Sequence, residues 1–239
     1  LIESHVFGTT CARVGCMPSK LLIAAAEARY HALHTDPFGV HLDKSSVTVN
    51  GEEVMHRVKS ERDRFVGFVL SDVEEWPADK RIMGEAKFID EHTVQIDDHT
   101  QISAGRIVIA TGSRPVILPQ WQGLGDKLII NDDVFSWKTL PKSVAVFGPG
   151  VIGLEIGQAL HRLGVKVHIF GLGGFLGGIS DPVVLEEAKK VFGEELTMNL
   201  DAQSEVKLDA EGNVEVHWQE GSESGVFTAE YMLAAVGRR

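Results

Sequence analysis

The spacing of hydrophobic and polar positions changes several times along the chain, and each change predicts a different element. Over 17–34, strong helix formers follow Pro18 and Ser19, which are typical first residues of a helix. Over 52–75, apolar residues recur every three or four positions among charged neighbours, which predicts an amphipathic packing helix. Residues 1–2 are apolar and typical of the end of a strand. The chain therefore opens with a strand end and two helices.

After the second helix the hydrophobic spacing shortens, which favours strands. The predicted strand segments, with a polar turn at 97–100 inside the second, are 81–89, 93–103 and 106–110. Pro115 and Pro119 then break the pattern and predict a domain boundary near 116–120.

The second half of the chain restarts with a β-α-β pattern. Its predicted elements are a strand over 144–147, a helix over 151–163, a strand over 165–170, a glycine-rich loop over 171–178, a helix from Asp181, a hairpin around 211–221 and a closing strand from Tyr231. Strands that alternate with helices predict an α/β protein with parallel sheets, to which 81–103 adds a small antiparallel β-meander.

Charge and hydropathy exclude two classes of partner. The 23 basic and 34 acidic residues give a formal net charge of −11, which repels a phosphate backbone, so we expect no nucleic acid partner. No apolar run approaches the roughly 18 residues that span a bilayer, and the first residues do not resemble a secretory signal. We therefore expect no membrane partner and a cytoplasmic location. Because the chain does not begin with Met, we also expect it to be a piece of a longer protein.

The two cysteines carry the most specific signal. Cys11 and Cys16 lie five positions apart within the stretch from Gly8 to Lys20, at the start of a predicted helix whose positive end favours a thiolate over a thiol. Such a pair can alternate between dithiol and disulfide. A structural disulfide, half of a zinc site and two inert cysteines are the alternatives. Zinc would need two further ligands, and the nearest histidines are His5 and His31, so we expect no metal.

The stretch GPGVIGLE forms a G-x-G-x-x-G pattern with Gly148, Gly150 and Gly153. The first glycine permits a tight turn, the second lets the backbone approach a pyrophosphate, and the third lets the helix pack closely on the strand. The pattern alone is weak evidence, since it also fits a merely glycine-rich turn. The strand before it, and the helix and strand after it, supply the context that dinucleotide binding requires.

A third stretch, IVIATGSRP at 107–115, places small residues after an apolar strand, where a ligand can lie against the backbone. By itself an ordinary strand and turn would explain it.

Together these motifs resemble those of the class I pyridine nucleotide-disulfide oxidoreductases, which include dihydrolipoamide dehydrogenase, glutathione reductase and mercuric reductase. The residues that match the family's cysteine motif are Gly8, Thr10, Cys11, Gly15, Cys16, Pro18, Ser19 and Lys20. Thr9 replaces a glycine and Arg13 replaces an asparagine of that motif. The resemblance implies two Rossmann-like domains: an N-terminally truncated FAD-binding domain over 1–117 and an NAD(P)-binding domain over 118–239.

The resemblance also implies four catalytic residues. Cys11 would be the interchange thiol that attacks the disulfide substrate, and Cys16 the thiol that faces the flavin. Lys20 would lie beside the flavin and pair with Glu155, so that both side chains point into one interdomain cleft. None of the ten histidines has the context of a catalytic base. We expect His92 and His99 to be surface residues.

The cofactors implied by the resemblance are FAD and NAD(P). In the first domain the cofactor-binding residues would be Glu3, Gly8, Thr10, Cys11, Lys20, Ala86, Thr111, Gly112 and Ser113, and in the second Gly148, Gly150, Val151, Ile152, Gly153, Glu155, Gly171 and Gly237. Glu3 on its own would equally suit a solvated strand end.

Two departures from the family pattern affect specificity. Gly171 stands where NAD-using relatives carry an acidic residue, and 171–180 contains no arginine for a 2′-phosphate, so we expect weak discrimination between NADH and NADPH or a preference set elsewhere. Arg13 adds a charge that we expect to lower a thiol pKa or alter substrate entry.

The sequence thus predicts a disulfide oxidoreductase that passes electrons between NAD(P)H, FAD and the cysteine pair, most like dihydrolipoamide dehydrogenase. The alternatives are a mercuric reductase-like enzyme, another disulfide reductase or a redox-inert nucleotide-binding fragment. The expected partner is a small disulfide or lipoyl-bearing substrate, and the full-length protein is expected to be a homodimer. The first glycine motif of the family and its C-terminal interface domain are missing from the chain, so this piece alone is expected to be inactive.

Overall fold

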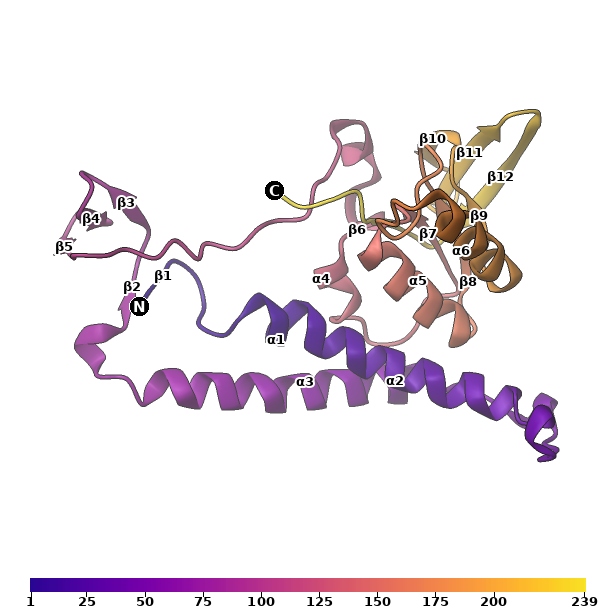
Figure 1. The fold of residues 1–239 in the computed structure, drawn as a ribbon, viewed down its shortest axis with the longest axis horizontal. Helices are drawn as coiled ribbons and strands as arrows, with labels where there is room; N and C mark the ends of the chain where they lie inside the picture. Colours follow the sequence, from indigo (N-terminus) through magenta and orange to yellow (C-terminus); the bar gives the residue numbers. More distant parts are fainter.

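The computed structural model describes residues 1–239 (Figure 1). The helices are α1 (Thr10–Val14), α2 (Cys16–Leu33), α3 (Gly51–Glu74), α4 (Asn131–Val134), α5 (Val151–Arg162) and α6 (Pro182–Glu195), with short 3-10 helices at Asp36–Phe38, Lys44–Ser46, Ala78–Lys80 and Pro119–Lys127. The strands are β1 (Ile2–Glu3), β2 (Ile82–Met83), β3 (Ala86–Phe88), β4 (Thr93–Ile96), β5 (Thr100–Ser103), β6 (Leu128–Ile129), β7 (Ser143–Phe147), β8 (Lys166–Phe170), β9 (Thr197–Asn199), β10 (Gln203–Leu208), β11 (Val214–Glu220), β12 (Glu223–Ala229) and β13 (Tyr231–Ala234).

A five-stranded parallel sheet, in the order β6-β13-β7-β8-β9, organises the second half. The predicted β-α-β unit is confirmed as β7-α5-β8, and β7 and β8 are buried along almost their whole length, as strands covered on both faces are. Asp181 caps α6 by accepting from the backbone N–H groups of Val183 and Val184. The α/β class is therefore confirmed.

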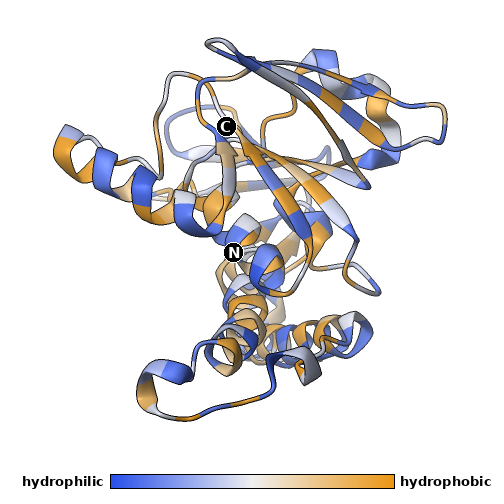
Figure 2. Ribbon diagram, turned by 90° about the vertical axis from the view of Figure 1, so that its right-hand side faces the viewer, coloured by the Kyte–Doolittle hydropathy of each residue, from blue (hydrophilic) through white to orange (hydrophobic).

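Different elements pack on the two faces of this parallel sheet. On one face α5 packs through residues such as Leu160 against Val146 and Ile169. On the other face the antiparallel sheet β10-β11-β12 packs through residues such as Phe227 against Phe147 and Phe170 of the parallel sheet. Blue and orange alternate along the strands and helices in Figure 2, as expected when each element buries one side.

The helices α2 and α3 lie side by side below the parallel sheet (Figure 1). Asn50 caps α3 by accepting from the backbone N–H groups of Glu52 and Glu53. Leu22 and Ala26 of α2, with Met55 of α3, belong to the same buried cluster as the α5 face of the sheet. The hydrophobic core thus crosses the boundary predicted at 117/118, and the division into two domains stays a prediction. No helix, the 24-residue α3 included, is both long enough and apolar enough to cross a bilayer.

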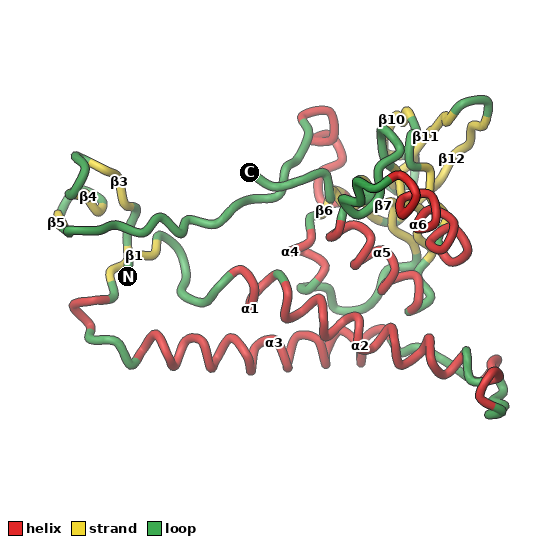
Figure 3. Tube along the Cα trace, viewed as in Figure 1, coloured by secondary structure: helices red, strands yellow, loops and turns green.

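At the other end of the molecule β1 and β2 form a two-stranded parallel sheet, and β3, β4 and β5 form the predicted antiparallel meander. The imidazole rings of His92 and His99 are exposed there, as predicted. A long connection runs from this end back toward β6 (Figure 3).

The prediction of a strand over 106–110 is wrong. The segment is extended but forms no ladder: no backbone-to-backbone hydrogen bond involves 105–113, and Val108 is 87% exposed. The physical reason is the missing neighbour, because β1 and β2 pair only with each other and no third strand lies beside this segment. An apolar composition favours a strand but does not supply its partner.

Candidate functional site

The two cysteines lie at consecutive helix starts. Thr9 accepts a hydrogen bond from the backbone N–H of Ala12 at 3.1 Å and so caps α1, in which Cys11 is the second residue. Cys16 is the first residue of α2, after a sharp turn at Gly15. A Cβ atom at Gly15 would lie only 3.0 Å from the carbonyl oxygen of Thr10 and 3.3 Å from the Cα of Cys11. A side chain at position 15 would therefore crowd the backbone of the turn that folds Cys16 back toward Cys11.

Both cysteines are free thiols and both are exposed. The neighbouring Cys16 thiol raises the pKa of Cys11, through hydrogen bonding first, with slight burial and charge repulsion adding to it. The expectation of a lowered pKa is therefore wrong at Cys11. Arg13 is not among the causes of this shift, and its Nη1 donates to the carbonyl of Phe7 at 3.3 Å. The two thiols are nonetheless close enough to influence each other's ionisation, as a redox pair requires.

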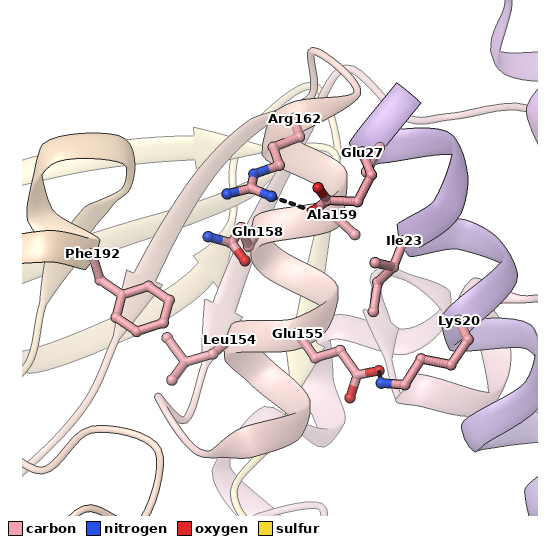
Figure 4. A pocket seen from close by; sticks show the side chains of 10 residues that line it. Lys20, Ile23, Glu27, Leu154, Glu155, Gln158, Ala159, Arg162 and Phe192 are labelled. Carbon is pink, nitrogen blue, oxygen red and sulfur yellow. Dashed lines mark hydrogen bonds and ion pairs between the residues drawn. The ribbon is translucent and has the colours of Figure 1, made fainter. Parts of the chain in front are cut away.

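The predicted contact between the two halves is confirmed. Nζ of Lys20, one turn into α2, lies 2.6 Å from Oε1 of Glu155 on α5 (Figure 4). The hydroxyl of Ser19 also donates to this Glu155 oxygen, at 2.8 Å. The ion pair is less buried than expected, since the Lys20 side chain is 67% exposed.

A pocket of about 270 Å³ lies between α2, α5 and α6. Lys20–Glu155 lies at one end of it and Glu27–Arg162 at the other (Figure 4). Arg162 also binds Glu195 of α6 through Nε and Nη2, and hydrogen bonding to Glu195 raises the pKa of the guanidinium. Each charged side chain that lines this pocket already has a partner.

The second glycine motif fits a dinucleotide. Gly148 has φ +108°, and a Cβ there would lie 2.4 Å from the carbonyl oxygen of Ala235. A Cβ at Gly153 would lie 2.0 Å from the carbonyl oxygen of Gly148, whereas one at Gly150 would meet nothing within 4 Å. Because no side chain caps α5 and Val151 is exposed, the N–H groups at the start of this helix are available to a phosphate.

Gly171 follows β8 directly, and Pro149 and Leu200 fill the space beside it. A Cβ there would lie 2.6 Å from Cγ and 2.8 Å from Cδ of Pro149, and 3.0 Å from the carbonyl oxygen of Leu200. An acidic side chain at this position has no room while Pro149 is present.

The turn at Thr111, Gly112 and Ser113 lies next to the cysteine motif. Gly112 has φ +69°, and a Cβ there would lie 4.0 Å from Oγ1 of Thr10. Arg238 joins this turn to the end of the chain, because its Nε donates to Oγ of Ser113 at 2.9 Å and its Nη2 to the carbonyl oxygen of Ser113 at 2.6 Å. Gly237, with φ +117°, precedes it in open space.

The remaining predicted residues, Glu3 and Ala86, lie with the small sheets. The carboxylate of Glu3 accepts from the backbone N–H of His5 at 3.0 Å, and Ala86 is exposed at the start of β3. Gly8, with φ +98°, packs beside Arg13. The structure thus gathers most of the predicted residues around α2 and α5, whereas Glu3 and Ala86 lie apart from them.

The family model described as pyridine nucleotide-disulphide oxidoreductase matches residues 1–239. The chain belongs to this family.

Curated relatives of this chain include a dihydrolipoyl dehydrogenase of Geobacillus stearothermophilus, 30% identical over 245 residues that cover all of this chain and 51% of the relative. A mercuric reductase of Bacillus cereus is 28% identical over 246 residues, covering all of this chain and 38% of the relative. The chain thus spans about half the length of the curated dehydrogenases it matches.

Among solved structures, the HOCl-induced flavoprotein disulfide reductase RclA from Escherichia coli superposes with a TM-score of 0.76 at 21% identity, covering all of this chain and 51% of that one. This likeness shows that the two chains share a fold.

Sequence reasoning missed several residues of the site. Ser19 lies inside the cysteine motif, next to Lys20, and that position is the signal that could have found its bond to Glu155. Arg238 stands beside Gly237, which was predicted. Asn131 and Arg162 lie in no motif, and nothing in the sequence around them indicates their contacts with other elements.

Proposed function

We propose that this chain is the redox-active part of a flavin-dependent disulfide oxidoreductase that passes electrons between NAD(P)H, FAD and the Cys11–Cys16 pair, most like dihydrolipoyl dehydrogenase. The observation that carries the proposal is the contact between Lys20 and Glu155. It places the helix that begins with Cys16 against the helix that begins with the second glycine motif. The thiol pair and the nucleotide motif thereby lie at the starts of two helices that pack against each other.

The residues divide between two cofactors. Gly148, Gly150, Val151, Ile152 and Gly153 would hold the pyrophosphate of NAD(P), with Glu155, Gly171 and Gly237 near it. The set around the flavin would be Glu3, Gly8, Thr10, Cys11, Lys20, Ala86, Thr111, Gly112 and Ser113. Bound FAD would supply two-electron transfer between the nicotinamide and the thiol pair.

The chain's own chemistry is thiol-disulfide exchange. The Cys11 thiolate attacks one sulfur of the substrate disulfide, so that a mixed disulfide forms and the other sulfur leaves as a thiolate that takes a proton. The Cys16 thiolate then attacks Cys11, forms the Cys11–Cys16 disulfide and releases the second substrate thiol. Because its neighbour raises the pKa of Cys11, we expect this first attack to accelerate toward alkaline pH.

The substrate, assembly and location extend this proposal. A small disulfide or a lipoyl group suits two exposed thiols, and we propose that the full-length protein is a homodimer. With only two cysteines, the chain suits a cytoplasmic location better than an oxidising compartment.

A mercuric reductase-like enzyme is the second candidate. The similarity to the mercuric reductase of Bacillus cereus favours it, and a close pair of thiols is a suitable ligand set for a soft metal ion.

The test is a thiol count in the full-length natural protein loaded with FAD. Under anaerobic conditions, NADH should convert the oxidised enzyme to a form with two additional titratable thiols, and lipoamide should reoxidise it. Cys16→Ser should abolish the reduction of lipoamide yet keep part of the hydride transfer to an artificial acceptor. No gain of thiols, or equal loss of both activities in Cys16→Ser, would contradict the proposal. Turnover with Hg²⁺ but not with lipoamide would favour the second candidate.

A further inference from the structure

The short helix that carries Cys11 ends with an unusual backbone group. A carbonyl in a continuous helix accepts from the N–H four residues later, and for Val14 that residue is Pro18, which has no N–H. The Val14 carbonyl at the end of α1 therefore lacks the donor four residues later, although α2 begins only two residues after it. A carbonyl left without a partner at such a position destabilises the helix end.

Asn131 supplies the missing donor from a distant part of the chain. Its Nδ2 donates to the Val14 carbonyl at 3.1 Å and also lies 2.8 Å from Oδ1 of Asp132. Asn131 is the first residue of α4 and is only 7% exposed, so this bond is shielded from water.

The same amide is held from its other side by Arg238. Nη1 of Arg238 donates to Oδ1 of Asn131 at 3.2 Å, while the rest of the guanidinium binds Ser113. One amide therefore links the turn between the cysteines to the two turns at Ser113 and Arg238. With its acceptor held by Arg238, the Asn131 side chain keeps its Nδ2 directed at Val14.

We propose that Asn131 is a positioning residue for the thiol pair: by binding the Val14 carbonyl it holds α1, and with it Cys11, against the start of α2. The inference deepens the proposed function and rests on it only for the pairing of Cys11 with Cys16. It assigns to Asn131 and Arg238 no contact with substrate.

The positioning has a redox consequence. When the pair is oxidised, both thiols lose their protons and two electrons pass to an acceptor disulfide, as the sulfur–sulfur bond forms. That bond requires the two sulfurs in a narrow geometry. An α1 that is held in place loses less conformational freedom when the bond forms, so the Asn131 contact stabilises the disulfide relative to the dithiol.

The experiment measures the redox equilibrium of the pair directly. The full chain is equilibrated with mixtures of reduced and oxidised glutathione, quenched and alkylated, and its Cys11–Cys16 disulfide is quantified by mass spectrometry. Asn131→Leu removes the donor at similar volume. The oxidation equilibrium constant should fall by roughly 3- to 10-fold, the effect of one net hydrogen bond, which equals about 15 to 30 mV.

Asn199 provides the matched control. It is 8% exposed and its amide bonds to His168 and Glu220, well away from α1. Asn199→Leu should destabilise the fold to a comparable degree and leave the redox equilibrium unchanged. Asn131→Asp keeps the acceptor for Arg238 while losing the donor at pH 8, so it tests the proposal if Asn131→Leu does not fold.

The outcomes separate the two proposals. A wild-type chain that forms no Cys11–Cys16 disulfide in any glutathione mixture overturns the proposed function and this inference together. A wild-type chain that forms it, with an equilibrium constant unchanged in the Asn131 variants or shifted equally in Asn199→Leu, overturns this inference alone.

Discussion

The ring of Pro149 occupies the space that a side chain at position 171 would need, because a Cβ on Gly171 would lie 2.6 Å from Cγ of Pro149. Gly171→Ala should therefore lower the free energy of unfolding by about 1–3 kcal/mol, the usual effect of overpacking. The effect should shrink by more than about half when Pro149 is also replaced by glycine. Urea denaturation of the single and double variants measures this coupling.

Gly150→Ala is the control for this prediction, since a Cβ there meets nothing within 4 Å. Its free energy of unfolding should stay within about 0.5 kcal/mol of wild type. Additive effects of the Pro149 and Gly171 changes would show that the two residues do not compete for one space.

Arg162 joins three helices through Glu27, Glu195 and the ring of Tyr30, whose centroid lies 4.0 Å from Cζ of Arg162. Its side chain is only 14% exposed. Arg162→Met removes the cation that binds both carboxylates, which keep only His31 and Gln158 as partners, and should lower the free energy of unfolding by about 1–3 kcal/mol. Chemical denaturation at low and high salt measures the loss.

The control for Arg162 is Arg64→Met, because Arg64 is 55% exposed and pairs with Glu61 on its own helix. Its change in free energy of unfolding should stay within about 0.5 kcal/mol. Equal losses in both variants would show that the Arg162 network adds nothing beyond a surface ion pair.

His168 gives the fold a pH dependence. Burial lowers the pKa of His168, a hydrogen bond to Asn199 opposes this shift, and Lys166 adds to it. In the unfolded chain the histidine has a pKa of about 6.5, so its imidazole binds a proton more readily there than in the folded chain. The free energy of unfolding should therefore fall as the pH drops from about 6.5 to 5, by up to about 1.4 kcal/mol per unit from this group.

His168→Gln should flatten the stability profile between pH 6.5 and 5, as measured by urea denaturation at a series of pH values. His92→Gln removes an exposed histidine and should leave the slope unchanged. A slope that survives in His168→Gln would assign the acid sensitivity to other groups.

The ion pair between Lys20 and Glu155 should matter more for electron transfer than for stability. Because Lys20 is 67% exposed, Glu155→Gln should change the free energy of unfolding by less than about 1 kcal/mol. In the full-length flavin-loaded protein we expect it to slow flavin reduction by NADH by about tenfold or more, since the negative charge that we propose beside the cofactors would be lost. Stopped-flow absorbance measures that rate.

The surface carboxylate Glu187, which pairs with Lys190, is the control for Glu155. Glu187→Gln should leave flavin reduction unchanged. A Glu155→Gln variant that reduces flavin at the wild-type rate would remove Glu155 from the catalytic set.

Much of the fold could be predicted because its signals are local. Helix-forming residues after Pro18, and the apolar spacing after Asn50, indicate α2 and α3 to within two residues of their observed bounds. The strand–glycine–helix order around Gly148 likewise identifies the β-α-β unit. The strand predicted at 106–110 failed because a strand depends on a partner elsewhere, which the spacing of its own residues cannot reveal.

In the site, too, residues with a local sequence signal could be predicted and residues that depend on distant contacts could not. Cys11, Cys16, Lys20 and Glu155 stand in motifs, and the contact between Lys20 and Glu155 followed from them. Asn131 has no such context, and its contact with Val14 bridges 117 positions of the chain. The pKa of Cys11 was predicted in the wrong direction because a helix start is a local feature, whereas the Cys16 thiol that raises it comes close only through the turn at Gly15.

The extended segment 106–113 leaves its amides open to water along a stretch of apolar side chains. In amide hydrogen exchange these residues should lose their protons at nearly the rate of an unstructured peptide, while the amides of β7 and β8 exchange only when the whole sheet opens. An open row of donors and acceptors flanked by Val108 and Ile109 is also a template for another chain. The concentration at which this chain self-associates should thus depend on this one segment more than on its net charge.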